Sequence, residues 1–246
     1  MQRRDAFLGV LALIVLWQLL AWAVGQPILP PPGQVLLVFL QELPGELGRH
    51  ILVSAGRVIA SIALAVALAV PAGLGLGQIK ALNRIFAPLI YVVYPIPKIV
   101  FLPVIFILFR AGELSRIILI TFFLFFQVLV LVRDEAAGLR PELIQSVRSL
   151  GAGRRALFRF VYLPASLPAV LSALRISVGT AIAVLYISEG YATSSGLGYY
   201  IVTESWGRLA YTEMYAGVVA MSLLGLALYF VVDALDRRLC PWRVAT

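Results

Sequence analysis

The sequence has 246 residues, of which 61% are hydrophobic and 13% are charged, and its formal net charge is +8. A soluble domain of this length needs far more polar surface, so the composition indicates an integral membrane protein and argues against a basic nucleic-acid-binding protein. The single cysteine, Cys240, and the single histidine, His50, exclude an internal disulfide and a metal site built from several such ligands.

Six long hydrophobic runs predict six membrane-spanning helices, and therefore an all-α polytopic membrane protein with one domain over residues 1–246. The first run follows a basic start, so a cleaved signal peptide is the alternative interpretation. Its length and the interfacial residues Trp17 and Trp22 favour an uncleaved span. The region 27–50 is expected outside, with one short amphipathic helix over 35–43. The runs cover approximately residues 6–24, 58–77, 86–109, 117–132, 169–187 and 214–235.

The second run ends in three closely spaced glycines, Gly73, Gly75 and Gly77. Small residues allow helices to approach closely in lipid, so this end of the run is expected to pack against a neighbouring helix. Residues 110–116, which contain three charges, are expected to form a short outer turn before the fourth run.

The third run contains prolines far from its ends, which is unusual for a membrane span. Pro95, Pro97 and Pro103 each remove a helical hydrogen bond, so they predict a broken helix whose free carbonyl groups face protein or a watery cavity. Lys98 lies among these prolines, and Arg175 lies in the fifth run. Charges at such depth usually face a bundle interior or a cavity, so Pro97, Lys98 and Arg175 are candidates for a translocation path that attracts an anion. The alternative is that each cation pairs with freed carbonyl groups or snorkels.

Residues 133–168 form the longest polar segment, which carries six arginines between two hydrophobic runs. Pro141 suits the first turn of a helix, and Gly151 supplies a stop. A second short helix follows, and we expect it to end at Pro164. The segment therefore predicts two short helices that lie at the membrane surface and are available to a partner. Their apolar stripe consists of Leu143, Ile144, Val147, Leu150, Leu157, Phe158 and Val161.

The spacing of Gly151, Val161 and the Leu163–Pro164 pair fits the pattern G-x9-[IV]-x-LP. This pattern resembles the EAA loop of the membrane subunits of ABC importers that work with a substrate-binding protein. The later string Ser194–Tyr199 is similar to the branch of that family associated with nitrate, sulfonates, taurine and bicarbonate. The resemblance covers about residues 55–236.

The resemblance implies a type I ABC importer permease fold with cytoplasmic coupling helices. It also implies a homodimeric pore, two cytoplasmic ATPase subunits, a periplasmic or lipid-anchored substrate-binding protein and transport by alternating access. Gln145 stands where the family usually has Glu, which puts any ionic contact there in doubt. Glu189 would face the outside entrance, as part of a gate or of the docking site for the binding protein; an interfacial acid that snorkels is the alternative. The residues expected to couple the loop to the ATPase are Leu143, Gln145, Val147, Leu150, Gly151, Ala152, Leu157, Phe158 and Pro164.

The chain lacks the phosphate-binding pattern G-x4-G-K-[ST], so it is not expected to be an enzyme, and ATP and magnesium would bind the partner ATPase. The predicted function is the permease subunit of an ATP-driven importer for a small oxyanion, a sulfonate or a related small organic molecule. A self-contained secondary transporter or channel is the alternative, although we find no internal repeat and no series of intramembrane acids. A membrane anchor without transport is the third interpretation.

Lysine and arginine residues are more frequent in the segments that would be cytoplasmic if the N-terminus were inside. The positive-inside rule then places both termini and the basic segment in the cytoplasm of a bacterium, with the chain in the inner membrane. The outer segments and their edges would hold Arg49, Arg57, Arg110, Arg116 and Arg208. The cytoplasmic segments would hold Arg3, Arg4, Lys80, Arg84, Arg133, Arg140, Arg148, Arg154, Arg155, Arg159, Arg237, Arg238 and Arg243.

Overall fold

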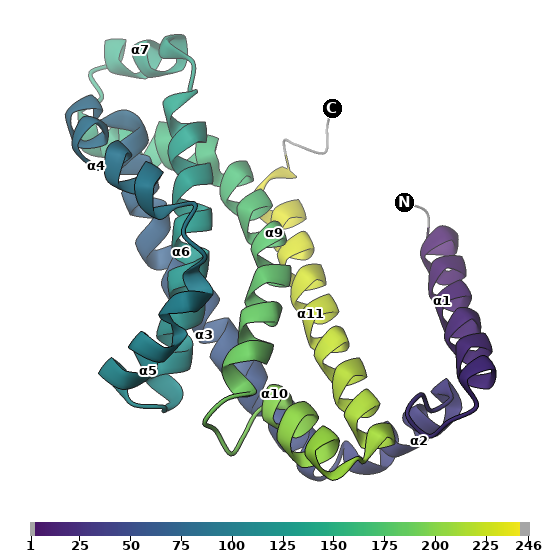
Figure 1. Ribbon diagram of the computed structural model, residues 1–246. Coiled ribbons are helices and arrows are strands. Elements are labelled where there is room, and N and C mark those ends of the chain that lie inside the picture. The colour runs from purple at the N-terminus through teal and green to yellow at the C-terminus, as the bar shows by residue number, and fades with distance from the viewer. Residues whose placement is uncertain (1–2, 242–246) are drawn as a thin grey trace. The chain divides into compact units, whose positions relative to one another are not determined.

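The protein is seen in a computed structural model that describes residues 3–241, without the side chains of Arg3, Arg4, Ala6, Phe7 and Arg154. Arg243, counted above among the cytoplasmic charges, lies outside the described residues. The described chain is helical and contains no strand (Figure 1). Its elements are α1 Arg3–Val24, α2 Pro32–Glu42, α3 Glu46–Gln78, α4 Lys80–Val93, η1 Lys98–Phe101, α5 Leu102–Phe109, α6 Glu113–Ala137, α7 Pro141–Ser149, α8 Arg154–Leu157, η2 Phe158–Tyr162, α9 Leu163–Glu189, α10 Leu197–Tyr199, η3 Tyr200–Ser205, η4 Trp206–Arg208 and α11 Tyr211–Leu239.

All six hydrophobic runs form helices, which confirms the predicted all-α architecture. Within the described residues, α3, α6, α11 and the long helix Arg155–Glu189 are each long and apolar enough to cross a membrane. The third run forms two helices, Lys80–Val93 and Lys98–Phe109, which qualify as one span only as a bent pair. The first run contributes a shorter apolar helix, Leu8–Val24, so its crossing of the membrane stays a prediction.

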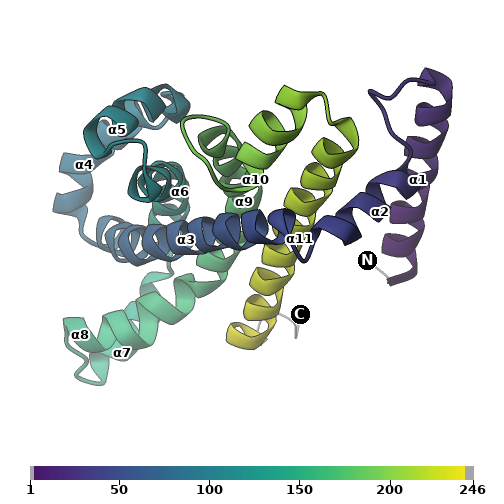
Figure 2. The ribbon, with the colours of Figure 1, turned by 90° about the horizontal axis from the view of Figure 1, so that it is seen from below.

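The break in the third run occurs where the prolines predict it. Tyr94 donates its N–H to the carbonyl of Ile90 and closes α4, and the chain then turns by 88° before η1 and α5. Pro97 directly precedes η1, and Pro103 lies in the first turn of α5, where a missing N–H costs little. Pro103 therefore starts a helix instead of interrupting one. Figure 2 shows α4 and α5 beside α6, and α5 packs against α6.

Two predicted loops are shorter than expected because the helices extend into them. α3 begins at Glu46, so His50 and Arg57 lie in a helix, and α3 continues past Pro71 to Gln78. α6 begins at Glu113, so Arg116 is helical and not part of an outer turn. The start of α6 is fixed by Ser115, whose Oγ donates to the carbonyl of Gly112 (2.7 Å) and accepts the N–H of Gly112 (3.1 Å).

The prediction that Pro164 ends the second short helix is wrong. The helix of α8 continues through the π-helix η2 and into α9, and it passes Pro164 and Pro168 without a stop. In the wider π turn, Leu163 donates to the carbonyl of Phe158, five residues earlier. Such a local change of hydrogen-bond register lets a helix continue past a proline, whose missing donor would otherwise break the regular pattern.

The chain divides into two compact units. The first unit contains Met1–Ala55 and Tyr186–Leu224, and the second contains Gly56–Leu185 and Gly225–Thr246. Helices α3, α9 and α11 contribute residues to both units. That residues 1–246 act as a single functional domain stays a prediction.

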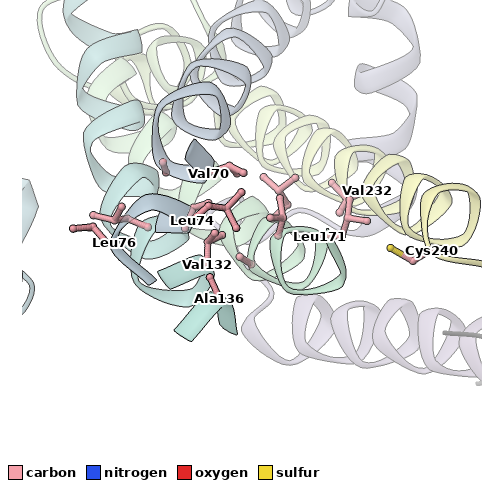
Figure 3. Close-up of a cluster of buried hydrophobic side chains, with 14 of the residues drawn as sticks. Val70, Leu74, Leu76, Val132, Ala136, Leu171, Val232 and Cys240 are labelled. Atoms are coloured by element: carbon pink, nitrogen blue, oxygen red, sulfur yellow. The ribbon is translucent and has the colours of Figure 1, made fainter. Parts of the chain in front are cut away.

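The second unit has an apolar core between α3, α6, α9 and α11, with Leu74, Val132, Leu171 and Val232 among its side chains (Figure 3). The predicted close approach of the glycines in α3 is found at two of three positions. A Cβ on Gly73 would lie 2.9 Å from the Cβ of Val132, whereas one on Gly75 would meet only a leucine methyl group at 3.8 Å. The third glycine of the set, Gly77, is even more tightly packed against α6.

Candidate coupling surface and transport site

The surface of α7 and of the turn after it is the most exposed part of the basic segment. α7 begins with Pro141 in its first turn, and Gly151 follows it with φ = +85°, a conformation that favours glycine. The side chains of Leu150 and Leu143 are 85% and 50% exposed. Large apolar side chains that are exposed beside several arginines, outside the apolar spans, are typical of a surface that another protein covers.

The other predicted coupling residues differ in how far their side chains are exposed. Gln145 and Gly151 are exposed, and Phe158 is 41% exposed. Leu157 is only 2% exposed, so in this conformation its side chain anchors the segment and offers a partner almost nothing. Val147, Ala152 and Pro164 are half-buried. Contact of these residues with an ATPase stays a prediction.

A cavity of about 350 Å³ lies between α7 and the helix that leads into α9. α7 also contacts the π-helix η2, which continues into α9. A push on α7 would therefore be transmitted to a long apolar helix through packed side chains and continuous backbone. The cavity is lined by Leu143, Val147, Phe160, Val161, Pro164 and Ala165.

Lys98 lies at the break between α4 and η1 and lines a second cavity. Its ammonium Nζ donates to the carbonyl of Tyr94 at 2.7 Å and lies 3.5 Å from the carbonyl of Ile96. The same Nζ lies 5.1 Å from the ring centre of Tyr94 and 5.5 Å from that of Phe126. These carbonyl groups are the ones that the helix break leaves free, as one of the two interpretations of Lys98 predicts. Pro97 lines the same cavity.

Arg175 forms an ion-pair network with the last helix. Its guanidinium lies 2.7 Å from Oδ1 of Asp233 and 3.2 Å from Oδ2 of Asp236, and Arg237 also pairs with Asp233. The charge of Arg175 is therefore balanced within the second unit, which weakens its case as an anion site. Sequence reasoning missed these partners, although Asp233 and Asp236 are three residues apart and so share a helix face.

Glu189 is fully buried at the end of α9. The hydroxyl of Ser54 donates to its two carboxylate oxygens at 2.9 and 2.8 Å, and the N–H of Gly198 donates to Oε2 at 3.0 Å. Ser54 in turn accepts the N–H of Leu197 at 2.8 Å. In this conformation Glu189 fixes the 194–199 string to α3 and exposes no surface to a solute, so its role at an entrance stays a prediction.

His50 also binds the 194–199 string, beside Ser54 and Glu189, and the sequence did not identify it as a candidate. Its Nδ1 accepts the N–H of Gly196 at 2.9 Å, so the ring proton lies on Nε2, which is 3.1 Å from Oε2 of Glu204. His50 and Ser54 are four residues apart and share one face of α3, a spacing that could have indicated a polar face. Three successive amides, Gly196 to Gly198, are thus held by side chains of α3 and α9.

Among the described residues, no group of three or more His, Cys, Asp or Glu side chains is arranged to hold a metal ion. The sequence comparison then decides the class of protein. Residues 61–242 match the family described as the binding-protein-dependent transport system inner membrane component. The chain belongs to this family. It is therefore a permease of the ABC importer type, and such permeases are not themselves enzymes.

Named relatives and solved structures agree with this assignment. The taurine transport system permease protein TauC of Escherichia coli is 30% identical, over 96% of this chain and 88% of that protein. The putative aliphatic sulfonates transport permease protein SsuC of Bacillus subtilis is 28% identical, over 94% of this chain and 84% of that protein. An inward-facing structure of the MetNI methionine ABC transporter has a TM-score of 0.65 at 22% identity, and covers 78% of this chain and 95% of that chain. This likeness confirms the predicted type I importer permease fold.

Proposed function

We propose that this chain forms the translocation path for a small organic sulfonate or a related oxyanion, as one of two identical copies in the inner membrane of a bacterium. A pair of cytoplasmic ATPase subunits would bind ATP and magnesium, and an external binding protein would deliver the substrate. The names of the taurine and aliphatic sulfonate relatives support this substrate class. The relative named as the formylaminopyrimidine permease ThiX of Halalkalibacterium halodurans, 26% identical over 98% of this chain, supports a wider range of small organic solutes.

The exposed apolar surface of α7 is the observation that carries the ATPase part of the proposal. Leu143 in α7 and Leu150 directly after it are exposed. Arginines flank this short helix, and the left-handed Gly151 follows Leu150. A short amphipathic helix of this kind fits into a groove of a partner, where apolar anchors and charged flanks fix its orientation. Because α7 contacts η2, movement of the ATPase pair would reach α9.

The proposed orientation places α7, the C-terminal end of α11 and the N-terminus in the cytoplasm. The excess of arginine and lysine in those segments supports it. The 194–199 string and η3 would then lie on the outer face, where the binding protein docks.

Uptake by the reconstituted transporter tests the proposal. The chain is reconstituted with its ATPase and binding-protein partners, and uptake of labelled taurine into liposomes is measured with and without ATP. We expect uptake to require ATP and both partners. Leu150→Glu should lower uptake at least about tenfold by placing a charge in the ATPase contact, because losing a buried apolar anchor costs more than 1.4 kcal/mol. Ala137→Glu, an exposed position at the end of α6, is the control.

Two outcomes would contradict the proposal. Solute flux through the chain alone would support the self-contained transporter or channel. Normal ATP-driven uptake in the Leu150→Glu variant would remove α7 as the site of coupling while leaving the importer assignment in place.

A further inference from the structure

A cavity of about 310 Å³ lies in the second unit, where the broken third run meets α6 and α9. This volume lies at the lower end of the range of small-molecule sites. Three separate elements build its wall, and each contributes a polar side chain or a carbonyl group. The lining residues are Tyr94, Ile96, Pro97, Lys98, Phe123, Gln127 and Thr180.

Lys98 brings a positive charge to this cavity. Its nearest partners are two carbonyl oxygens and two aromatic rings, which are dipoles and quadrupoles and carry no net charge. No described Asp or Glu lies within ion-pair distance of its ammonium group. Arg175 differs, since Asp233 and Asp236 neutralise it. A cation within a membrane span is costly unless an opposite charge compensates it, so an anion that enters this cavity would be stabilised.

Gln127 and Thr180 supply further hydrogen-bond donors on the wall of the cavity. Both side chains are half-buried, and neither has a hydrogen-bond partner among the described residues. The ammonium, the carboxamide and the hydroxyl come from three different elements, and together they offer the hydrogen-bond donors that the oxygens of a tetrahedral anion accept.

The remaining wall is apolar and aromatic. Phe123 and the ring of Tyr94 line it, and Phe126 lies beneath the ammonium group. This wall suits a short hydrocarbon chain attached to the anionic group.

We propose that this cavity is a transient binding site for the anionic group of a small organic sulfonate, with Lys98 as its counter-ion and Gln127 and Thr180 as its donors. The site makes the permease itself select for negative charge, in addition to any selection by a binding protein. Only the chemical class of the ligand in this inference rests on the proposed function. The bond of Lys98 to the Tyr94 carbonyl is open to the cavity, so an incoming anion can take its place without unfolding a helix.

Chemical labelling of a cysteine in the cavity tests this site without any transport measurement. Thr180→Cys is made together with Cys240→Ala, which removes the only native cysteine. The purified full chain is treated with the anionic reagent 2-sulfonatoethyl methanethiosulfonate or with its cationic trimethylammonium counterpart. Each rate is divided by the rate with free N-acetylcysteine. We expect a normalised preference of about tenfold or more for the anionic reagent, because unit charges a few ångströms apart interact strongly at an effective dielectric constant near 20.

Substitutions of lysine identify the source of the preference. Lys98→Met should abolish it, Lys98→Arg should retain it, and Lys80→Met, at an exposed position at the start of α4, should leave it unchanged. Ethanesulfonate should slow labelling by the anionic reagent, and it should do so less in Lys98→Met. Should Lys98→Met fail to fold, Gln127→Leu serves instead and should weaken the protection by ethanesulfonate.

The proposal is overturned if Thr180→Cys shows no preference for the anionic reagent, or if the preference survives Lys98→Met. Loss of ATP-driven uptake with the charge preference intact would count against the proposed importer and leave this site in place. Normal ATP-driven uptake without any charge preference would count against this site and leave the proposed importer in place.

Discussion

The hydroxyl of Ser54 in α3 and the carboxylate of Glu189 at the end of α9 form a buried hydrogen-bonded pair, with oxygen–oxygen distances of 2.8 and 2.9 Å. Both side chains are fully buried. Each also accepts a backbone N–H from the string between α9 and α11, Ser54 from Leu197 and Glu189 from Gly198. The pair therefore joins two helices that are distant in sequence and fixes the loop that follows α9.

Removal of the Glu189 carboxylate should destabilise the first unit. Glu189→Ala leaves the Ser54 hydroxyl and the Gly198 N–H without their acceptor in a buried place, and each unsatisfied donor costs about 1–3 kcal/mol. Glu189→Gln keeps one oxygen and should cost less than Glu189→Ala. Thermal unfolding of the detergent-solubilised protein measures the difference, with Glu135→Gln on the exposed surface of α6 as the control. Equal stability of Glu189→Ala and the control would show that the pair does not stabilise the fold.

A methyl group on Gly198 should have a similar effect for a steric reason. Its Cβ would lie 2.6 Å from the Cβ of Glu189 and 2.6 Å from the carbonyl oxygen of Tyr186, and one of these contacts is with backbone. Overpacking of this kind typically costs about 1–3 kcal/mol. We expect a lower unfolding temperature for Gly198→Ala than for Gly207→Ala, where the nearest atom would be 3.6 Å away. Unchanged stability in both variants would mean that the loop can shift away from α9.

Local sequence patterns predicted the parts of the structure that local forces determine. Hydrophobic runs marked the helices, prolines marked the break before Lys98, and Pro141 and Gly151 marked the ends of α7. Partners distant in the sequence were not predictable, because many acidic residues could pair with Arg175 and only the packing of α9 against α11 selects Asp233 and Asp236. The continuation of α9 through Pro164 was missed for a related reason, since no single residue type marks a π-helix.

The ion pairs of Arg175 should show coupled energetics. Arg175→Leu leaves Asp236 without its cation and Asp233 with Arg237 alone. We expect a loss of about 1–3 kcal/mol, below the cost for a fully buried pair because a third of the Arg175 side chain is exposed. The triple variant Arg175→Leu with Asp233→Asn and Asp236→Asn removes all three charges and should recover much of the loss. The measurement is a thermodynamic cycle of unfolding temperatures. It compares the unchanged protein, Arg175→Leu, the variants with the aspartates replaced, and the triple variant. A triple variant as unstable as the sum of its parts would show that the charges act independently.

The contact of α3 with α6 depends on Gly77 and should not tolerate a larger residue. A Cβ at this position would lie 2.6 Å from the Cβ of Ala136 and 2.6 Å from the carbonyl oxygen of Arg133, so Gly77→Ala must push the two helices apart. The side chain of Gln78, which donates to the carbonyl of Ala136, would be displaced at the same time. We expect Gly77→Ala to lower the unfolding temperature in detergent, with a cost of about 1–3 kcal/mol. Gly56→Ala, in the same helix with no atom within 4 Å, should be neutral or stabilising because alanine has the higher helix propensity. A stable Gly77→Ala variant would show that the close approach of these helices is not required.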